Sequence, residues 1–358
     1  MLQLAGFRSV RALVLLGFSL AFVGLPTLSE AATTRNRKAV KSSSQKKTRS
    51  ASTRRATTRY SASKSRQRRL AMARARQAAY ARQLAEIQTP QFKTGADGEK
   101  IPDVRAGAAI IYNPTTHQVL YESNAQTPRS IASITKVMTA VAFLENEVDF
   151  SREVTVHPDD MRGASTTYLR RNDRVTIQQL LHLLLIGSDN VAARTLARAS
   201  LYGPLGFVER MNQKAAELGL SNTRYYDPSG LYADNMSSAF DMARLISFAA
   251  GDERIASIMR TKEYQFATPT RARTVTLHNT NHLVGTDVDV RGGKTGFISK
   301  SGYCLATLLR LPQGDQVAVV VLGAKSNPAR FWETRHLFNW LAGKAPTVLA
   351  TQTPEQQD

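Results

Sequence analysis

The sequence of residues 133–144 is Ser-Ile-Thr-Lys-Val-Met-Thr-Ala-Val-Ala-Phe-Leu. Its apolar side chains recur at the i, i+3, i+4, i+7 spacing of an amphipathic helix, at Ile134, Val137, Met138, Val141 and Leu144. Ser133 and Lys136 lie three positions apart at the start of this helix, so their side chains project from one face. Unpaired backbone N–H groups and the positive end of the helix dipole favour a developing negative charge there. The segment therefore predicts a packed helix that presents a hydroxyl beside an amine.

This pair of side chains is suited to nucleophilic catalysis. A serine hydroxyl is a poor nucleophile until a base removes its proton, and a lysine acts as that base only if its pKa falls, through desolvation or a second nearby cation. Ser-x-x-Lys alone is weak evidence, because it also occurs at Ser43–Lys46, Ser44–Lys47 and Ser61–Lys64, in a stretch with few large apolar residues. An N-cap serine followed by a surface lysine explains most isolated matches.

Two further motifs follow along the chain. Ser188-Asp189-Asn190 comes directly after Gly187, in a predicted turn between two helices, where the alternative role is to cap the second helix. Lys294-Thr295-Gly296 follows two glycines in a strand-like run, and glycines weaken a strand unless something approaches its backbone. An extended substrate paired with this strand is one such partner, and a β-bulge or turn is the alternative. In this order the three motifs indicate serine acyl transfer, with Lys294 as the second cation.

The segments around the motifs predict an α+β fold. Ala108–Tyr112 and Gln118–Glu122 are strand-like and flank Asn113–His117, which indicates a hairpin, and a Thr176–Gln179 capping box starts a helix that ends at Gly187. Further helices are expected from Asn190, from Pro204 to Leu218 and from Asn327, and an antiparallel meander is expected from Val288–Phe297, Tyr303–Leu309 and Gln316–Gly323. Strands at both ends with helices between them predict one sheet assembled from both termini of the domain.

At these motifs the chain resembles the low-molecular-mass penicillin-binding proteins, the D-alanyl-D-alanine carboxypeptidase/endopeptidase family. The resemblance runs from about Ile110 to Leu341 and is closest to the penicillin-binding protein 7/8 branch, the D-alanyl-D-alanine endopeptidases. Besides the three motifs, the segments that carry it are Pro128–Ser133, Asp227–Leu231, Ser237–Ala239, Asn279–Leu283 and Gly302–Leu305. It implies the serine β-lactamase/DD-peptidase-like fold with an inserted helical subdomain. It also implies cleavage of D-Ala-D-Ala bonds in peptidoglycan stem peptides through an acyl-enzyme, with β-lactams as covalent inhibitors.

The resemblance implies a role for each motif residue. The catalytic residues are Ser133 as nucleophile, Lys136 as its general base, Ser188 as proton relay to the leaving amine, and Asn190 as a holder of the substrate backbone. The substrate-binding residues are Lys294 with its positive potential, Thr295 with a hydroxyl for the substrate carboxylate, Gly296 and Phe297. The oxyanion hole consists of the backbone N–H groups of Ser133 and Phe297.

Some roles are not expected of the chain. Asp189 departs from relatives that carry Glu there, and the resemblance implies no chemistry for that middle position. No cofactor is expected, and the six histidines show no metal-ligand spacing. The single cysteine, Cys304, excludes an intrachain disulfide and is expected to be a buried thiol.

Three alternatives to a cross-link endopeptidase are open. A carboxypeptidase that trims pentapeptides is the nearest, although carboxypeptidases of this family commonly add a β-domain and an amphipathic membrane helix, and this chain ends 14 residues after Lys344. A β-lactamase of this motif type deacylates with a loop glutamate, and no glutamate lies between Glu217 and Glu253. An inactive wall-binding protein is disfavoured, because all the polar motif residues are intact.

Composition divides the chain into four parts. Residues 1–31 have a basic start, a 14-residue apolar run and a small-x-small site, which predicts a signal peptide and a periplasmic enzyme. Residues 32–100 are expected to form a basic, low-complexity, disordered tail that contains at most a short helix from Leu70 to Ile87. The catalytic domain is expected at 101–345, with a disordered end at 346–358.

The charge of the chain is concentrated in the tail. Residues 33–85 hold 17 Lys or Arg and no acidic residue, whereas the chain from Glu86 onward holds 29 basic and 27 acidic residues. On an exported protein, such a tail suits an anionic wall polymer or a membrane surface better than nucleic acid. A solvated spacer without a partner is the alternative.

Overall fold

The computed structural model describes residues 50–268 and 274–348, and the predicted signal peptide lies outside this range. The chain divides into two units, Met1–Arg69 and Leu70–Asp358. The described part of the first unit is helical and belongs to α1 (Ser50–Gln88). The last residues of α1 and all other described elements belong to the second unit.

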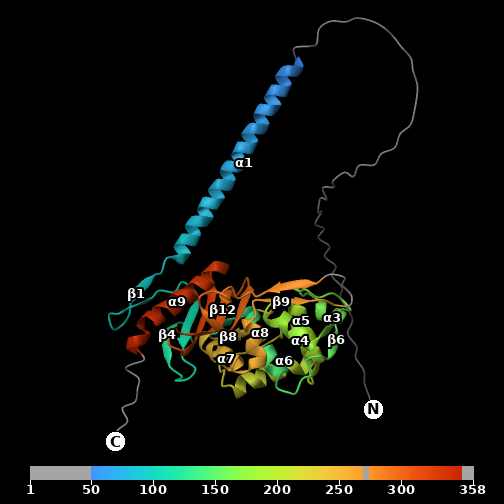
Figure 1. The fold of residues 1–358 in the computed structure, drawn as a ribbon, viewed down its shortest axis with the longest axis vertical. Coiled ribbons are helices and arrows are strands. Elements are labelled where there is room, and N and C mark those ends of the chain that lie inside the picture. Colours follow the sequence, from blue (N-terminus) through green and yellow to red (C-terminus); the bar gives the residue numbers. More distant parts are fainter. Residues whose placement is uncertain (1–49, 269–273, 349–358) are drawn as a thin grey trace, which may run out of the picture. The chain divides into compact units, whose positions relative to one another are not determined.

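A five-stranded antiparallel sheet forms the core of the second unit (Figure 1). The strand order is β11-β12-β13-β3-β4, and the bounds are β3 (Ala108–Tyr112), β4 (Val119–Ser123), β11 (Asp289–Ile298), β12 (Gly302–Arg310) and β13 (Gln316–Ala324). The N-terminal hairpin joins the C-terminal meander where Val320 of β13 pairs with Ile110 of β3. This confirms the prediction of an α+β domain whose sheet comes from both ends. Strand β11 lies at one edge of the sheet.

Both faces of the sheet are covered by helices. Successive side chains of a strand point to opposite sides, so each strand contributes residues to both buried faces. On one face, Val319 and Val321 pack with Leu337 of α9 (Asn327–Val348). On the other face, Val320 joins the larger apolar cluster built with the inserted helices. The sheet is therefore a layer between α9 and the helical subdomain.

The helical subdomain confirms the predicted insertion. Its elements are the 3-10 turn η1 (Ala132–Ile134), α2 (Thr135–Phe143), α3 (Pro158–Met161), α4 (Ile177–Leu185), α5 (Asn190–Ala199), α6 (Gly203–Glu217), α7 (Ala239–Gly251) and α8 (Glu253–Arg260). The predicted capping box is present at the start of α4, where Thr176 Oγ1 accepts from the Gln179 backbone N–H at 3.2 Å. Figure 1 shows α4, α5 and α6 together at the end of this unit away from β4.

Four short antiparallel pairs complete the unit. They are β1 (Phe92–Thr94) with β2 (Lys100–Pro102), β5 (Arg129–Ser130) with β8 (Met236–Ser237), β6 (Glu153–Thr155) with β7 (Arg174–Thr176), and β9 (Glu263–Phe266) with β10 (Val275–His278). The β5–β8 pair matters most for the site, because it fixes the chain just before Ser133. Directly after it, the Ile131 N–H donates to the Asn235 carbonyl at 3.1 Å.

Within residues 32–100, predicted as a disordered tail, the structure has the helix α1 from Ser50 to Gln88 and the β1–β2 hairpin. The helix is longer than the short one expected at 70–87. Its sequence is rich in Ala, Arg and Gln, which are good helix formers, and contains neither Gly nor Pro. Residues 32–49 of the predicted tail and 349–358 of the predicted disordered end lie outside the described residues. Across the described ranges, no helix combines the length and apolar character that a membrane crossing needs.

Candidate active site

Segments from three parts of the chain meet around Ser133. The turn η1 and the start of α2 carry Ser133 and Lys136, the turn between α4 and α5 carries Ser188, and the edge strand β11 carries Lys294. Lys136 Nζ lies 2.8 Å from Ser133 Oγ, and Lys294 Nζ lies 2.9 Å from Ser188 Oγ. The structure thus places the sequence motifs together in two serine–lysine pairs.

The backbone is strained at both serines. Ala132, next to the first, and Ser188 itself have φ angles of 48° and 56°, in the left-handed region that residues other than glycine rarely adopt. Strain of this kind persists only where the surrounding packing enforces it, and it is concentrated at functional sites. The two turns that direct the serine hydroxyls are therefore held by their neighbours rather than by local preference.

Two glycines supply the close packing around Ser133. A Cβ atom at Gly230 would lie 2.0 Å from the Ala132 carbonyl oxygen, and Gly230 also has a φ of 77°. A Cβ atom at Gly296 would lie 2.6 Å from the Ile131 carbonyl oxygen and 3.2 Å from the Ser133 backbone nitrogen. The glycine of the third motif thus allows β11 to contact the turn that carries Ser133.

Lys136 is fully buried and has three polar partners. Its Nζ lies 2.8 Å from Asn190 Oδ1, 2.5 Å from the Ser229 carbonyl oxygen and 2.8 Å from Ser133 Oγ. Burial lowers the pKa of Lys136 to about 7, although two nearby carboxylates act in the opposite direction. A neutral amine has two N–H bonds and one lone pair. Because the amide and carbonyl oxygens can only accept, they take both N–H groups, and the lone pair faces the Ser133 hydroxyl.

Lys294 is the second fully buried lysine. Its Nζ donates to Ser188 Oγ and to the Thr295 carbonyl oxygen, both at 2.9 Å. Burial, and then the positive charges of Lys136 and Arg330, hold the pKa of Lys294 well below its ordinary value. The sequence suggested that Lys294 would be the cation that lowers the pKa of Lys136. In the structure, burial is the main cause for both lysines.

The second motif combines a side chain of the site with a helix cap. Asn190 is the first residue of α5, and its buried side chain reaches Lys136. Asp189 is the N-cap of α5 and accepts from the Ala192 N–H at 2.9 Å and the Tyr168 N–H at 2.6 Å. Burial raises the pKa of Asp189, while these hydrogen bonds act in the opposite direction. The motif therefore serves both purposes: its middle residue, Asp189, caps α5, and Asn190 contributes to the site.

The segment Asp227–Leu231 is part of the site, although sequence analysis assigned it no role there. The Asp227 carboxylate accepts from the Ser229 N–H at 2.9 Å, the Tyr232 N–H at 3.2 Å and Asn235 Nδ2 at 2.6 Å. These bonds fold the loop so that the Ser229 carbonyl faces Lys136. The carboxylate is thereby bonded to its own loop. In the sequence, the turn residues Asp-Pro-Ser-Gly mark this loop.

Two further contacts support β11 and were not predicted. Arg330 Nη1 on α9 donates to the Gly296 carbonyl at 3.0 Å and to the Cys304 carbonyl at 3.2 Å. Thr295 Oγ1 donates to Thr280 Oγ1 at 2.7 Å. Arg330 lies 34 residues from its partner in sequence, and no motif marks it. Phe297, the last predicted site residue, is 49% exposed beside this cluster.

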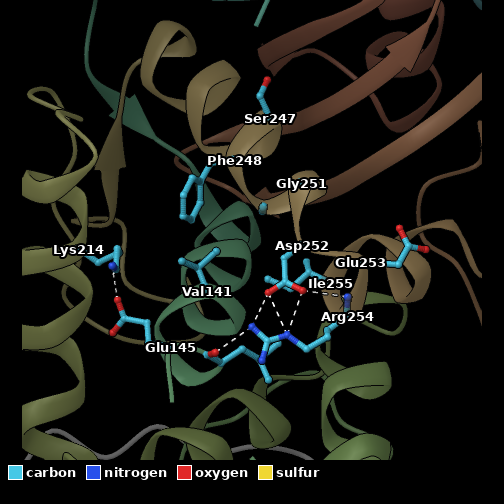
Figure 2. Close-up of a pocket in the computed structure, with 12 residues that line it drawn as sticks. Val141, Glu145, Lys214, Ser247, Phe248, Gly251, Asp252, Glu253, Arg254 and Ile255 are labelled. Carbon is cyan, nitrogen blue, oxygen red and sulfur yellow. Dashed lines mark hydrogen bonds and ion pairs between the residues drawn. The ribbon is translucent and has the colours of Figure 1, made fainter. Parts of the chain in front are cut away.

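A cavity of about 780 Å³ lies elsewhere, where the ends of α2 and α6 meet the junction of α7 and α8 (Figure 2). None of the motif residues lines it. Figure 2 shows Lys214 paired with Glu145 and Arg254 paired with Asp252. Glu253, also in the lining, pairs with Arg260 outside it. Within residues 50–268 and 274–348, no cluster of three or more His, Cys, Asp or Glu is arranged to hold a metal ion.

Comparison with known proteins gives consistent matches. A family model described as D-alanyl-D-alanine carboxypeptidase matches residues 95–326. The D-alanyl-D-alanine endopeptidase of Escherichia coli (strain K12) is 32% identical over 256 residues, which cover 70% of this chain and 81% of that protein. The D-alanyl-D-alanine carboxypeptidase DacC of the same organism is 33% identical and covers 67% and 62% of the two chains. The crystal structure of the Streptomyces K15 DD-transpeptidase aligns with a TM-score of 0.64 and 31% identity, over 68% of this chain and 98% of that one.

Proposed function

The chain belongs to the D-alanyl-D-alanine carboxypeptidase family, and from that membership we propose that it is a serine D-Ala-D-Ala peptidase that acts on peptidoglycan stem peptides through an acyl-enzyme on Ser133. The observation that carries the mechanism is the environment of Lys136, a buried amine with a pKa of about 7 whose Nζ lies 2.8 Å from the Ser133 hydroxyl oxygen. A base with a pKa near neutrality is half unprotonated at working pH, which is the condition for general-base catalysis.

In the acylation step, Ser133 Oγ attacks the carbonyl carbon of the penultimate D-Ala while its proton passes to Lys136 Nζ. The backbone N–H groups of Ser133 and Phe297 donate to the oxyanion that forms. Ser188, hydrogen-bonded to Lys294, relays this proton from Lys136 to the departing amine as the C–N bond breaks, which leaves Lys136 neutral again. A water molecule then hydrolyses the Ser133 ester with Lys136 again as base, and the free enzyme is restored.

The substrate backbone adds to the edge of the sheet. Among the strands that the structure describes, β11 pairs with β12 alone, so an extended peptide can pair along Lys294–Phe297 as a further strand. Asn190 holds the peptide from the opposite side, Thr295 offers its hydroxyl to the substrate carboxylate, and Lys294 supplies positive potential. Gly296 keeps this strand close enough to Ser133 for the attack.

Cleavage of cross-links is the favoured reaction. The match to the E. coli endopeptidase covers 81% of that protein, against 62% for the carboxypeptidase DacC. The two reactions share the acyl-enzyme and differ in the leaving amine, which belongs to a neighbouring stem peptide in a cross-link and to free D-Ala in a pentapeptide. A carboxypeptidase is therefore the second candidate function.

Digestion of purified peptidoglycan separates these functions. The full chain without its signal segment is incubated with sacculi, and the released muropeptides are resolved by chromatography. The expected result is a fall in cross-linked dimers and a matching rise in monomers. The Ser133→Ala variant should change neither amount. Release of free D-Ala with no loss of dimers would instead identify a carboxypeptidase.

The proposed substrate also fixes the place of action. A signal peptide at residues 1–31 would export the enzyme across the inner membrane to the periplasm, where cross-linked wall is found. The basic segment 33–85 would then hold the enzyme on an anionic wall polymer or membrane surface through its 17 positive charges.

A further inference from the structure

Both tryptophans of the chain line one pocket on α9, outside the active site. The pocket has a volume of about 290 Å³ and lies where α9 meets the β1–β2 hairpin and the segment just before it. Its lining residues are Gln88, Pro90, Phe92, Trp332, Arg335, His336, Asn339 and Trp340. Four of these eight side chains are aromatic.

The aromatic side chains lie on the outer face of α9. Trp332, His336 and Trp340 recur at intervals of four, which places them on one side of the helix. Their sequence neighbours Phe331 and Leu337 are buried in the apolar cluster between α9 and the sheet. Trp340 packs on the apolar cluster of this face, edge-on to Tyr121, and Lys344 Nζ lies 4.9 Å from the centre of its ring. Trp332 belongs to neither apolar cluster, and a solvent-facing helix surface normally carries charged residues, so its indole ring needs an explanation beyond the packing of the core.

The β1–β2 hairpin is fastened to this face and forms one wall of the pocket. The His336 ring nitrogen Nε2 lies 2.8 Å from the Gln91 carbonyl oxygen, and Trp340 Nε1 donates to the Lys100 carbonyl at 3.2 Å. The Phe92 ring meets the His336 ring edge-on, with centroids 4.9 Å apart. Because these contacts hold the wall in place, a ligand would not have to order it on binding.

The polar groups left over in the pocket are neutral. Within the described ranges, the Trp332 indole N–H and the side-chain amides of Gln88 and Asn339 have no hydrogen-bond partner. The charged side chain in the lining, Arg335, is paired with Asp287. The pocket on α9 therefore offers aromatic faces and amide groups without an unpaired charge.

We propose that this pocket binds an N-acetylhexosamine unit of a glycan strand. A pyranose ring has an apolar C–H face that can lie on an indole ring, and a rim of hydroxyl and acetamido groups that can bond to amides and an indole N–H. Such a sugar is uncharged, which matches the lining. The proposal rests on the proposed function, because the stem peptides are attached to glycan. A second site for the same polymer raises the effective concentration of stem peptides at Ser133.

Tryptophan fluorescence tests the proposal directly, because every tryptophan of the chain lies in the pocket. The full chain is titrated with a β-1,4-linked N-acetylglucosamine tetramer that carries no peptide. We expect a saturable change in emission. Trp332→Ala should weaken the affinity at least tenfold, while Trp340 still reports, and Trp332→Phe should retain part of it. The control Phe248→Ala removes an exposed aromatic ring outside the pocket and should leave the titration unchanged.

A second measurement separates this site from the catalytic one. With a glycan-linked substrate, Trp332→Ala should raise KM and leave kcat unchanged, and with a glycan-free stem peptide it should change neither. A normal rate of penicillin acylation would show that the variant is folded. The proposal is overturned if the tetramer gives no saturable signal, if Trp332→Ala binds it as wild type does, or if the KM of the glycan-free peptide rises equally. Failure of the proposed function would give a different result, namely no penicillin adduct on the wild-type chain, whatever the sugar titration shows.

Discussion

At the scale of single residues, the proposed chemistry depends on the protonation state of Lys136. The ammonium form has no lone pair, so it cannot take the Ser133 proton, and only the neutral form is active as a base. Burial lowers the pKa of Lys136 to about 7, so the neutral fraction rises as the pH rises through 7. Below this pKa the active fraction falls about tenfold for each pH unit.

The rate of acylation should therefore rise with pH and level off, with a midpoint near 7. Stopped-flow measurement of benzylpenicillin acylation between pH 5 and 9 gives the profile. Lys136→Arg is the matched variant, because its guanidinium stays protonated throughout and it should not be acylated at measurable rates. A flat profile across this range would show that Lys136 is not the base.

Asp189 is predicted to act on stability rather than on chemistry. Asp189→Ala leaves the buried N–H groups of Ala192 and Tyr168 without their acceptor, and we expect a loss of about 3 kcal/mol in the free energy of unfolding. Denaturant unfolding measures this loss. Asp189→Asn keeps one of the two acceptor oxygens and should therefore show an intermediate loss, because the Ala192 and Tyr168 N–H groups donate to different oxygens. If Asp189→Ala unfolds at the wild-type midpoint, the carboxylate does not hold this turn.

At the scale of elements, the sequence predicted what local patterns determine. The hairpin β3–β4, the meander β11–β13 and the helices α2, α4, α5, α6 and α9 follow from alternation, capping and helical spacing. The helices α7 and α8 and the pair β9–β10 were not predicted, because their apolar residues pack against segments remote in sequence. In the site, the motifs identified the serines and lysines. The contributions of Ser229, Thr280 and Arg330 depend on tertiary contacts that no local pattern reveals.

The contact between β11 and η1 provides a test at this scale. In Gly296→Ala, the new Cβ would lie 2.6 Å from the Ile131 carbonyl oxygen, so the strand must move away from Ser133. We expect a stability loss of about 1–3 kcal/mol, typical of overpacking, and acylation by penicillin slowed by about a hundredfold or more. Gly343→Ala on α9 is the control, because no atom lies within 4 Å of its new Cβ, and it should not affect acylation. Wild-type acylation by Gly296→Ala would mean that this contact does not position the nucleophile.

At the scale of the whole molecule, charge separates the chain into two parts. The tail 33–85 is strongly basic, and the chain from Glu86 onward has nearly balanced charges. From residue 64 to residue 83 the Lys and Arg residues of α1 fall on all sides of the helix, so it has no continuous apolar face to insert into a membrane. Any binding by this segment is therefore electrostatic and should weaken with salt.

Deletion of residues 33–85 should leave turnover of a small soluble stem peptide unchanged and reduce sedimentation with sacculi at low salt. The reason is that the deletion removes 17 positive charges and no residue of the site. Raising the salt concentration should bring the full-length chain to the level of the truncated one, because the Debye length falls to about 8 Å at physiological ionic strength. Equal sedimentation of both chains at low salt would identify the tail as a spacer.

The central claim is that the assembled site forms a covalent acyl-enzyme on Ser133. Its most direct test is the intact-protein mass after a brief reaction with benzylpenicillin, followed by peptide mapping of the adduct. The wild-type chain and the control Ser221→Ala, which alters an exposed serine, should gain the mass of one drug molecule, located on Ser133 and persisting for many turnovers. Ser133→Ala should gain no mass while keeping the wild-type thermal transition, because its half-buried hydroxyl contributes little to packing. An adduct on Ser133→Ala, or on another residue of the wild-type chain, would contradict the account.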